Sequence, residues 1–454
     1  MRNAPERTRV EEAASFLMAR AGHKGAAGAD VVYRFSTGHS VSLHDGQPEE
    51  NLSGFSFGIG LRTLDKVGRQ GIAHGNDLDR RSLEDIVDWS LNNCASAEPD
   101  ENVFLGEPPF AGGDDLELWD RRIGEDLSAD ERRTLCEEMH REALAADGRV
   151  TSVRSASWSD GAGETYYAST AGASAWAAGT TGGCGVSVVM ESGEAIEMGG
   201  YGDESRWLSS LSPVSIAKEA VRRTGLILGG RPWPTGRYDL VLDGQSASSI
   251  VDVLGELFLA SNVHKGRSFF AESMGQAVGS DMITLVDDGL LPRGLASSPF
   301  DGEGMARRKT CLMRNGVVEH WLYNLRYAAI DGVPTTGNAS RGISGTPDVS
   351  CSNLALLPGA WTVQDLVLQV GRGIYITELL GLHTINPVSG DFSLGIKGAE
   401  ICGGEFGGAV SGMTIAGNMK DVLKSIDLVG NDFKYYGEIG SPSLVIRDVA
   451  AAGV

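Results

Sequence analysis

Apolar residues recur with a helical period in four segments of the first 228 residues. These segments are 10–22, 81–96, 127–148 and 212–225. The second and third begin with sequences typical of a capping box, in which a serine and an acidic residue three positions later bond to each other's backbone amides. The pairs are Ser82 with Asp85 and Ser128 with Glu131. The fourth begins at Ser212, with Pro213 in the first helical position. The pattern predicts four helices.

Between these helices the period changes to two, which is typical of strands with one buried face. The alternating segments are 29–47, 55–75, 151–170 and 172–200. Each predicts an antiparallel hairpin. We expect the first hairpin to turn at Ser-Thr-Gly (36–38) and Asp-Gly (45–46), and the third at Asp-Gly-Ala-Gly (160–163).

A run of glycine and proline at 228–236 separates two halves of the chain. Its two prolines cannot continue a regular element on either side. A strand at 238–244, a helix at 246–262 and many short strands follow. We therefore expect an α+β fold with an N-terminal mixed α/β sheet domain (1–228) and a mostly antiparallel, β-rich C-terminal domain (229–454).

Charge and cysteine spacing argue against a nucleic-acid-binding protein and against a disulfide-bonded one. Lys and Arg number 39 against 60 Asp and Glu, so the net charge is −21. A surface this acidic is repelled by nucleic-acid phosphates. The six cysteines form no Cys-x-x-Cys pair, which is typical of free thiols in a reducing compartment. The sequence contains no long apolar run and no secretory signal. We expect a cytoplasmic protein that binds neither nucleic acid nor membrane.

Six motifs follow one another along the chain. They are FSFGIGLRTLDKVGRQGIAHGNDL (55–78), GNASRG (337–342), SCSNLALLPG (350–359), GLHTINPVSGDFSLGIKGAEI (381–401), GMTIAGNMKDVLKSIDLVGNDF (412–433) and GSPSLVIRD (440–448). In this order they resemble the TldD/PmbA (TldE) family. The resemblance implies a two-subunit metallopeptidase. Its TldD-type subunit carries zinc on a helical HExxxH motif with a cysteine ligand near the C-terminus, and its TldE/PmbA-type subunit has a similar fold without these ligands.

The histidines of this sequence do not match such a zinc site. A catalytic zinc needs about three protein ligands and a nearby carboxylate that acts as base. His39 and His44 are the two histidines within five positions of each other. They lie in a predicted hairpin rather than on a helix, and Ser40 follows the first where the glutamate of the motif would stand.

The position that resembles the zinc helix carries other residues. When SNVHKGRS (261–268) is aligned with the stretch after the family's zinc helix, Val251 and Glu256 take the histidine positions and Asp252 takes the glutamate position. No cysteine follows Gly-Asn-Asp at 430–432. The resemblance therefore implies a TldE/PmbA-type chain with no metal, cofactor or catalytic residue of its own.

Five polar residues are candidates for binding a peptide. They are Arg372, His383, Thr384, Asn386 and Asp391. Asn-Pro and Ser-Gly-Asp sequences are also typical of turns, so a structural role for His383 and Asp391 stays open. Arg372 could hold a peptide carboxylate or anchor a loop.

By resemblance, we expect the non-catalytic subunit of a heteromeric zinc peptidase. Its partner would be a TldD-type HExxxH homologue that holds the zinc. Its substrates would be small or unfolded peptides, natural-product precursors among them, bound as an added strand. The alternative is a stand-alone homodimer with metal-independent biosynthetic chemistry around His383, Asp391 and Glu256. A regulator of DNA gyrase, an older label of the family, fits the net charge of −21 poorly.

Overall fold

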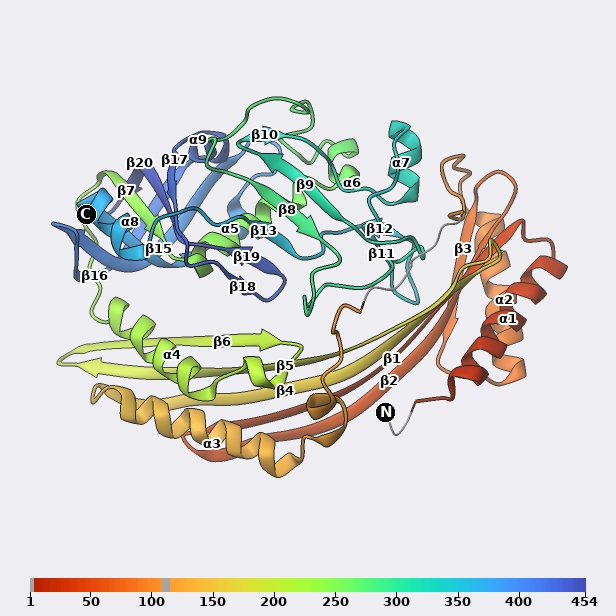
Figure 1. Ribbon diagram of the computed structural model, residues 1–454, viewed down its shortest axis with the longest axis horizontal. Helices are drawn as coiled ribbons and strands as arrows, with labels where there is room; N and C mark the ends of the chain where they lie inside the picture. Colours follow the sequence, from red (N-terminus) through yellow and green to blue (C-terminus); the bar gives the residue numbers. More distant parts are fainter. Residues whose placement is uncertain (1–3, 108–114) are drawn as a thin grey trace.

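The computed structural model describes residues 4–107 and 115–454 of the chain and has an α+β fold. Figure 1 shows a long curved sheet from the first half of the chain and, above it, the half that contains the C-terminus. Helices pack on one face of the long sheet, and the C-terminal half lies over the other face. Among the described residues, no helix is long and apolar enough to cross a membrane.

The N-terminal sheet contains six antiparallel strands in the order β3-β2-β1-β4-β5-β6. They are β1 (Gly28–His44), β2 (Gln47–Leu64), β3 (Gln70–Gly75), β4 (Val150–Ser169), β5 (Ser174–Ser192) and β6 (Ala195–Ser205). The helices of this half are α1 (Arg7–His23), α2 (Arg80–Ser96), α3 (Ala129–Ala146) and α4 (Pro213–Ile227), with the short η1 (Arg122–Asp126) and η2 (Leu208–Ser210). The four predicted helices are confirmed. Trp158 of β4 is buried against Met139 of α3, whereas its neighbours Ser157 and Ser159 point to the opposite face.

Two of the predicted turns are wrong. β1 continues through 36–38, where Thr37 pairs with Phe55 of β2 and with Ala162 of β4. β4 continues through 160–163, because Gly161 pairs with Gly38 on one side and the neighbouring β5 on the other. The glycines at these places lie inside long strands with partners on both sides. The expected Asp-Gly turn at 45–46 does join β1 to β2.

The helix caps agree with the sequence at two positions and differ at one. Ser128 and Glu131 form the expected capping box of α3, and Ser212 accepts a hydrogen bond from the Ser215 amide at the start of α4. At α2 the expected Ser82 cap is wrong. Asp79 is the N-cap, and its carboxylate accepts hydrogen bonds from the amides of 81 and 82. An aspartate three residues earlier therefore satisfies the free amides of the first turn.

The C-terminal half contains two six-stranded sheets and a two-stranded one. The first sheet has the order β16-β15-β14-β7-β20-β17, with bounds β7 (Gly236–Leu242), β14 (Arg372–Leu380), β15 (Asp391–Cys402), β16 (Glu405–Asn418), β17 (Ile426–Val429) and β20 (Leu444–Ala452). The second has the order β10-β9-β8-β13-β19-β18, with bounds β8 (Leu285–Asp288), β9 (Lys309–Arg314), β10 (Val317–Val318), β13 (Leu354–Leu356), β18 (Lys434–Tyr436) and β19 (Ile439–Ser441). The third pairs β11 (Ala339–Ser340) with β12 (Asp348–Val349). β7 with β14 and β13 with β19 are parallel pairs, and the other pairs of these sheets are antiparallel.

The first C-terminal sheet closes on itself. β16 pairs with β15 and also with β20, so the strands β16-β15-β14-β7-β20 form a ring. Apolar side chains from all five strands are buried in one core, among them Leu240, Ile374, Leu394, Ile415 and Ile446. The ring closes where 414–416 of β16 pair with 450–452 of β20.

The helices of the C-terminal half are short. They are α5 (Gly244–Glu256), α6 (Ala260–His264), α7 (Leu325–Asp331), α8 (Val363–Val370), α9 (Met419–Lys424) and η3 (Leu382–Thr384). The single helix expected over 246–262 is interrupted after Glu256. There the Asn262 side chain donates to the Glu256 carbonyl at 2.8 Å, and the Ser268 hydroxyl donates to the Leu257 carbonyl at 2.7 Å. These side chains satisfy carbonyls that end the helix.

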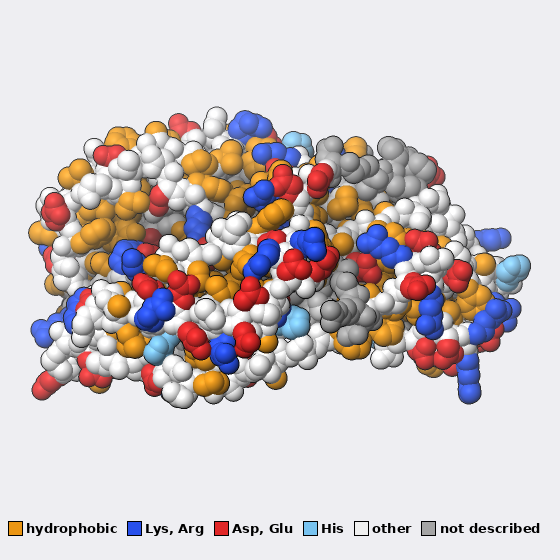
Figure 2. Space-filling model, turned by 60° about the horizontal axis from the view of Figure 1, so that its bottom comes forward, with side chains coloured by type: hydrophobic (Ala, Val, Ile, Leu, Met, Phe, Trp, Pro, Cys, Tyr) orange, Lys and Arg blue, Asp and Glu red, His pale blue; other side chains and the backbone are white. Residues whose placement is uncertain are grey.

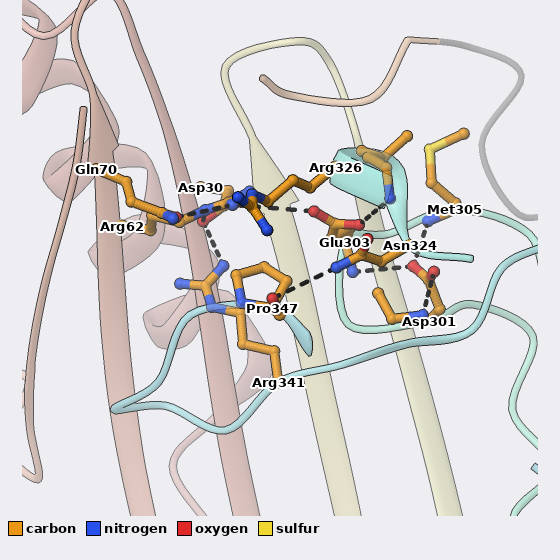
Figure 3. Close-up of polar contacts among 12 residues, drawn as sticks. Asp30, Arg62, Gln70, Asp301, Glu303, Met305, Asn324, Arg326, Arg341 and Pro347 are labelled. Carbon is orange, nitrogen blue, oxygen red and sulfur yellow. Dashed lines mark hydrogen bonds and ion pairs between the residues drawn. The ribbon is translucent and has the colours of Figure 1, made fainter. Parts of the chain in front are cut away.

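A buried ionic cluster joins the two halves at one end of the long sheet (Figure 3). Asp30 of β1 accepts hydrogen bonds from Arg62 of β2 at 2.5 and 3.1 Å and forms an ion pair with Arg341 from the C-terminal half. Glu303, also from the C-terminal half, lies 3.9 Å from Arg62 and accepts a hydrogen bond from the Leu325 amide at 2.8 Å. The four charged side chains are almost fully buried. They connect elements about 300 positions apart in the sequence.

Candidate functional site

A cleft of about 600 Å³ lies between the N-terminal sheet and the C-terminal half. Its lining comes from β4, β5 and β6 on one side and from α5 and the β18–β19 hairpin on the other. The lining residues are Ser157, Ser159, Gly183, Cys184, Gly202, Asp203, Glu204, Gln245, Ser248, Ser249, Asp252, Tyr436, Gly437 and Ile439. We take this cleft as the candidate site, because it is built by both halves of the chain and is lined by polar groups.

The sheet side of the cleft is a floor of small residues. Opposite residues of antiparallel strands share a face, and Ser40, Ser159, Gly183 and Glu204 follow one another across four strands. On β1, β4 and β5 the adjacent residues Val41, Trp158 and Cys184 belong instead to the core with α3 and α4. Serine and glycine on this face leave the space above the sheet open, whereas large side chains in their place would fill the cleft.

A second hollow, of about 510 Å³, continues this floor. It shares Ser159, Gly183 and Glu204 with the cleft and extends to Gly38 of β1 and Gly54 of β2. Gly38 and Gly54 pair with each other, and a Cβ added at either would meet no atom within 4 Å. Nothing inside the chain requires glycine at these two places, although glycine weakens a strand. A glycine of this kind is typical of a place where another backbone approaches closely.

Helix α5 forms the opposite side of the cleft because its sequence is amphipathic. Gln245, Ser248, Ser249 and Asp252 line the cleft, at the spacing i, i+3, i+4 and i+7 of one helix face. Ile250, Val251 and Leu254 lie on the other face, in the hydrophobic core of the C-terminal half. Asp243 caps the helix through a 2.7 Å hydrogen bond from the Ser246 amide.

The cleft carries more acidic than basic side chains. Asp203 forms an ion pair with Lys434 at 2.7 Å, and the same ammonium donates to the Tyr201 hydroxyl at 2.8 Å. Glu204 and Asp252 have no ion-pair partner among the described residues. Burial raises the pKa of Asp252 above its ordinary value. A carboxylate that is partly desolvated without a counter-charge is a candidate for interaction with a ligand.

The residues around α5 do not fit a zinc ion. At the positions that resemble the zinc ligands, Val251 is buried in the core, and Glu256 at the helix end accepts a hydrogen bond from Asn262 at 3.2 Å. Of the three aligned residues only Asp252 lines the cleft. The nearby Cys351 is half-buried, and desolvation of its thiol raises its pKa well above the ordinary value, which opposes the thiolate that zinc requires. Over 4–107 and 115–454, no group of three or more His, Cys, Asp or Glu residues is arranged to hold a metal.

Two of the five residues predicted to bind peptide hold a turn together. The Asn386 side chain accepts hydrogen bonds from the amides of Val388 and Ser389 at 2.8 and 3.1 Å. The Asp391 carboxylate accepts from the Ser389 hydroxyl at 2.7 Å and from the Asn418 side chain at 2.9 Å. These bonds, that of the Ser389 hydroxyl first, lower the pKa of Asp391 below its ordinary value. Both side chains thus have partners within the chain.

The other three predicted residues lie further apart. His383 is exposed on η3, and Thr384 beside it donates to the Ser393 carbonyl at 2.8 Å. η3 packs near α5, but neither residue lines the cleft. Arg372 is exposed at the start of β14, whereas His383 follows the end of that strand. The structure therefore groups His383, Thr384, Asn386 and Asp391 in one loop and places Arg372 at the other end of the strand.

Of the polar residues that line the cleft, the sequence singled out Asp252, as the residue at the position of the family's glutamate, and predicted none of them to bind peptide. A signal for Gln245, Ser248, Ser249 and Asp252 was present, as a polar stripe on an otherwise apolar helix. For Glu204 no local signal existed, because its position opposite α5 depends on how the two halves pack.

Comparison with known proteins gives matches along most of the chain. Three domain models of the PmbA/TldA metallopeptidases match it: domain 1 at 29–94, the central domain at 122–228 and the C-terminal domain at 235–453. The metalloprotease PmbA of Escherichia coli O157:H7 is 26% identical over 99% of this chain and 97% of its own length. A metalloprotease of Methanocaldococcus jannaschii is 25% identical over 89% of this chain and 90% of its own.

Solved structures show the same architecture. A putative modulator of a DNA gyrase from Thermotoga maritima MSB8 matches with a TM-score of 0.89 and 26% identity, over 98% of this chain and 100% of that one. TldE from Thermococcus kodakarensis matches with a TM-score of 0.88 over 98% of this chain and 100% of that one. At 20% identity, the second likeness concerns the fold alone.

Proposed function

The chain belongs to the PmbA/TldD metallopeptidase family, and we propose that within it this chain is the subunit that binds peptide and carries no metal. The observation that carries the proposal is the composition of α5. The helix lies against the cleft where the family resemblance implies the zinc helix, yet its cleft-facing side chains are Gln245, Ser248, Ser249 and Asp252. One carboxylate and three neutral groups are not a ligand set for a catalytic zinc.

The shape of the cleft supports a peptide as the ligand. Its floor consists of small residues on a sheet, and the floor continues over Gly38 and Gly54, where a foreign backbone has room. An extended peptide offers backbone amides and carbonyls at regular spacing, so contacts to its main chain accept many sequences. Small or unfolded peptides fit this site better than a folded protein does.

We propose that hydrolysis takes place on a partner subunit of the same family that carries the HExxxH motif. When bound there, a zinc ion would supply an activated water and polarise the peptide carbonyl. The residues of this chain would then hold the peptide extended and keep it at the cleft. The name metalloprotease, which several relatives carry, would describe the pair of subunits.

Two measurements test this function. Purified without chelator, the chain should contain well below one zinc per molecule by elemental analysis, and an HExxxH homologue prepared in the same way serves as control. Peptide hydrolysis should require both proteins and should stop when a chelator is added. About one zinc per chain, or chelator-sensitive hydrolysis by this chain alone, would overturn the assignment. Turnover by the chain alone that a chelator does not affect would support the homodimeric alternative instead.

A further inference from the structure

The charge of the cleft is not balanced within the chain. Three carboxylates line it (Asp203, Glu204 and Asp252), and no lysine or arginine is among the residues that line it in the described structure. The ion pair of Lys434 with Asp203 neutralises one of the three. Glu204 and Asp252 remain, one on the sheet and one on the helix, on opposite sides of the same space.

A further carboxylate, that of Glu438, lies near Glu204 and Asp252. Glu438 lies in the β18–β19 hairpin between two residues that line the cleft. Burial raises the pKa of Glu438, and the charges of Glu204 and Asp252 raise it further, against the influence of Arg206 and Arg307. The guanidinium of Arg206 is already bonded to backbone carbonyls, at 2.8 Å to Gly294 and 3.2 Å to Thr180. Arg307, whose Nε and Nη1 are buried without a hydrogen-bond partner, offsets part of the charge of Glu438. Glu204 and Asp252 have no such cation paired with them among the described residues, so the cleft between them keeps a negative charge.

The position of Glu204 connects this charge to the path of a peptide. Glu204 lines both the cleft and the second hollow, which leads to Gly38 and Gly54. A chain that extends along the floor from the two glycines therefore passes Glu204 and then enters the space between Glu204 and Asp252. A side chain that points from the peptide into that space meets two carboxylates.

We propose that the cleft selects extended peptides that carry a lysine or arginine side chain, which Glu204 and Asp252 bind between the sheet and α5. This inference rests on the proposed function and specifies its substrate class. A cation placed there gains two carboxylates that have no ion-pair partner among the described residues, one on each side of the cleft. A neutral side chain of the same length gains no such contact, and an acidic one is repelled.

The test is a binding series with four fluorescent octapeptides of glycine, serine and alanine that differ at one central position. That position is lysine, arginine, norleucine or glutamate, and the full chain is titrated against each peptide. We expect the lysine and arginine peptides to bind about tenfold more tightly than the norleucine peptide, the effect of about 1.4 kcal/mol. Their advantage should shrink as salt is added, because salt screens charge.

Variants identify the residues responsible. Asp252→Asn and Glu204→Gln should each reduce the ratio of the affinity for the lysine peptide to the affinity for the norleucine peptide. Glu12→Gln removes the same charge from an exposed position on α1 and should leave the preference intact. Circular dichroism and thermal unfolding of each variant show whether it is folded.

The possible outcomes separate the two proposals. Equal affinity for the lysine and norleucine peptides would overturn the selection for cations while the proposed peptide binding stands. A preference that survives in both variants would also overturn it, because the charge would then act from elsewhere. If none of the four peptides binds, the proposed function itself fails, and the inference fails with it.

Discussion

Asp30 is a carboxylate in the interior of the protein, and its charge depends on two arginines from different halves of the chain. Burial alone would raise its pKa, but Arg341 and Arg62 lower it below the ordinary value. Tyr167 donates a further hydrogen bond at 3.1 Å. A buried ion cluster of this kind adds little net stability when complete, whereas removing one member leaves an uncompensated charge.

We expect Arg341→Met to destabilise the protein by about 3 kcal/mol, because it removes one counter-charge from buried Asp30. Urea unfolding measures the loss. Arg80→Met is the control, since Arg80 pairs with Glu84 at an exposed site and its loss should cost less than about 1 kcal/mol. If the two substitutions lower the free energy of unfolding equally, Asp30 does not depend on Arg341 as a counter-charge.

Glu303 makes the stability of the protein depend on pH. Burial raises its pKa from 4.5 to about 7, with Arg62 acting against this and Asp301 and Asp30 adding to it. An acid with a higher pKa in the folded state binds more protons when folded, so stability falls as pH rises between the two values.

The substitution Glu303→Gln should remove this dependence. Relative to the variant, the free energy of unfolding of the unaltered chain should fall by on the order of 2–3 kcal/mol between pH 4.5 and about 7. One pKa unit corresponds to about 1.4 kcal/mol. Unfolding free energies of both proteins at pH 5 and pH 8 test this. A difference that does not change with pH would show that Glu303 ionises as it does in water.

At the scale of the single element, α2 depends on its N-cap. Asp79 accepts hydrogen bonds from two amides of the first turn, at 3.0 and 3.3 Å, and its charge lies near the positive end of the helix dipole. Asp79→Ala should cost about 1 kcal/mol in unfolding free energy. Ser82→Ala, at the position that the sequence pattern favoured, is the matched control and should have almost no effect. The reverse order would mean that the serine caps the helix.

The first part of β2 is a free edge. β3 pairs with β2 at Ile59–Leu64, so from 47 to 57 β1 is the one paired neighbour among the described strands. Leu52 and Phe55 are 59% and 53% exposed there, and the segment contains no lysine or arginine. Glu49 and Glu50 lie at its start, but 51–57 carries no charged residue. A long edge that exposes apolar side chains without a nearby charge is prone to pair with another chain.

We expect Leu52→Lys to reduce self-association of the isolated chain, because a lysine at an edge opposes pairing of strands. Light scattering at increasing protein concentration measures it. Leu144→Lys introduces the same charge at a 42% exposed position on α3 and should change association less. If both variants behave alike, net charge rather than the edge controls association.

Helices could be predicted from this sequence more reliably than strand lengths. A helix is determined by local periodicity and caps, as in α3 with Ser128 and Glu131. Whether Gly38 and Gly161 turn the chain or continue a strand depends on neighbours more than 100 positions away, which pair with them in the structure. Tertiary pairing outweighed the turn preference of glycine at both places.

The candidate site was less accessible to prediction for the same reason. Asn386 and Asp391 are turn residues and bond to nearby groups, so their polar character does not report a ligand. Glu204 and Asp252 lie 48 positions apart and face each other only through the packing of two halves. Sequence alone could identify the polar face of α5 but not the surface that it faces.

At the scale of the whole molecule, each half has its own hydrophobic core. Two cores consist of residues from 10 to 221, with α1 and α2 on one part of the long sheet and α3 and α4 on the other. The largest core consists of residues from 240 to 451. A small cluster that contains Val32, Tyr167 and Phe300 connects the halves, together with the charges around Asp30. Around the cleft this face of the long sheet carries serine, glycine and carboxylate residues, whereas at the other end it carries the apolar Val32 and Tyr167 of that cluster.

These facts predict that 1–228 folds without the rest of the chain. Its helices would still cover the apolar face of the sheet, and water would replace Arg341 around Asp30, while Arg62 stays as counter-charge. We expect the fragment to unfold cooperatively in urea with the circular dichroism of a mixed helix and sheet protein, at lower stability than the full chain. The fragment 229–454, whose ring of strands is closed, is the matched comparison. A fragment 1–228 that lacks a cooperative transition while 229–454 retains one would show that the long sheet needs the contacts at the junction to fold. The domain boundary at 228 would then separate two sheets but not two folding units.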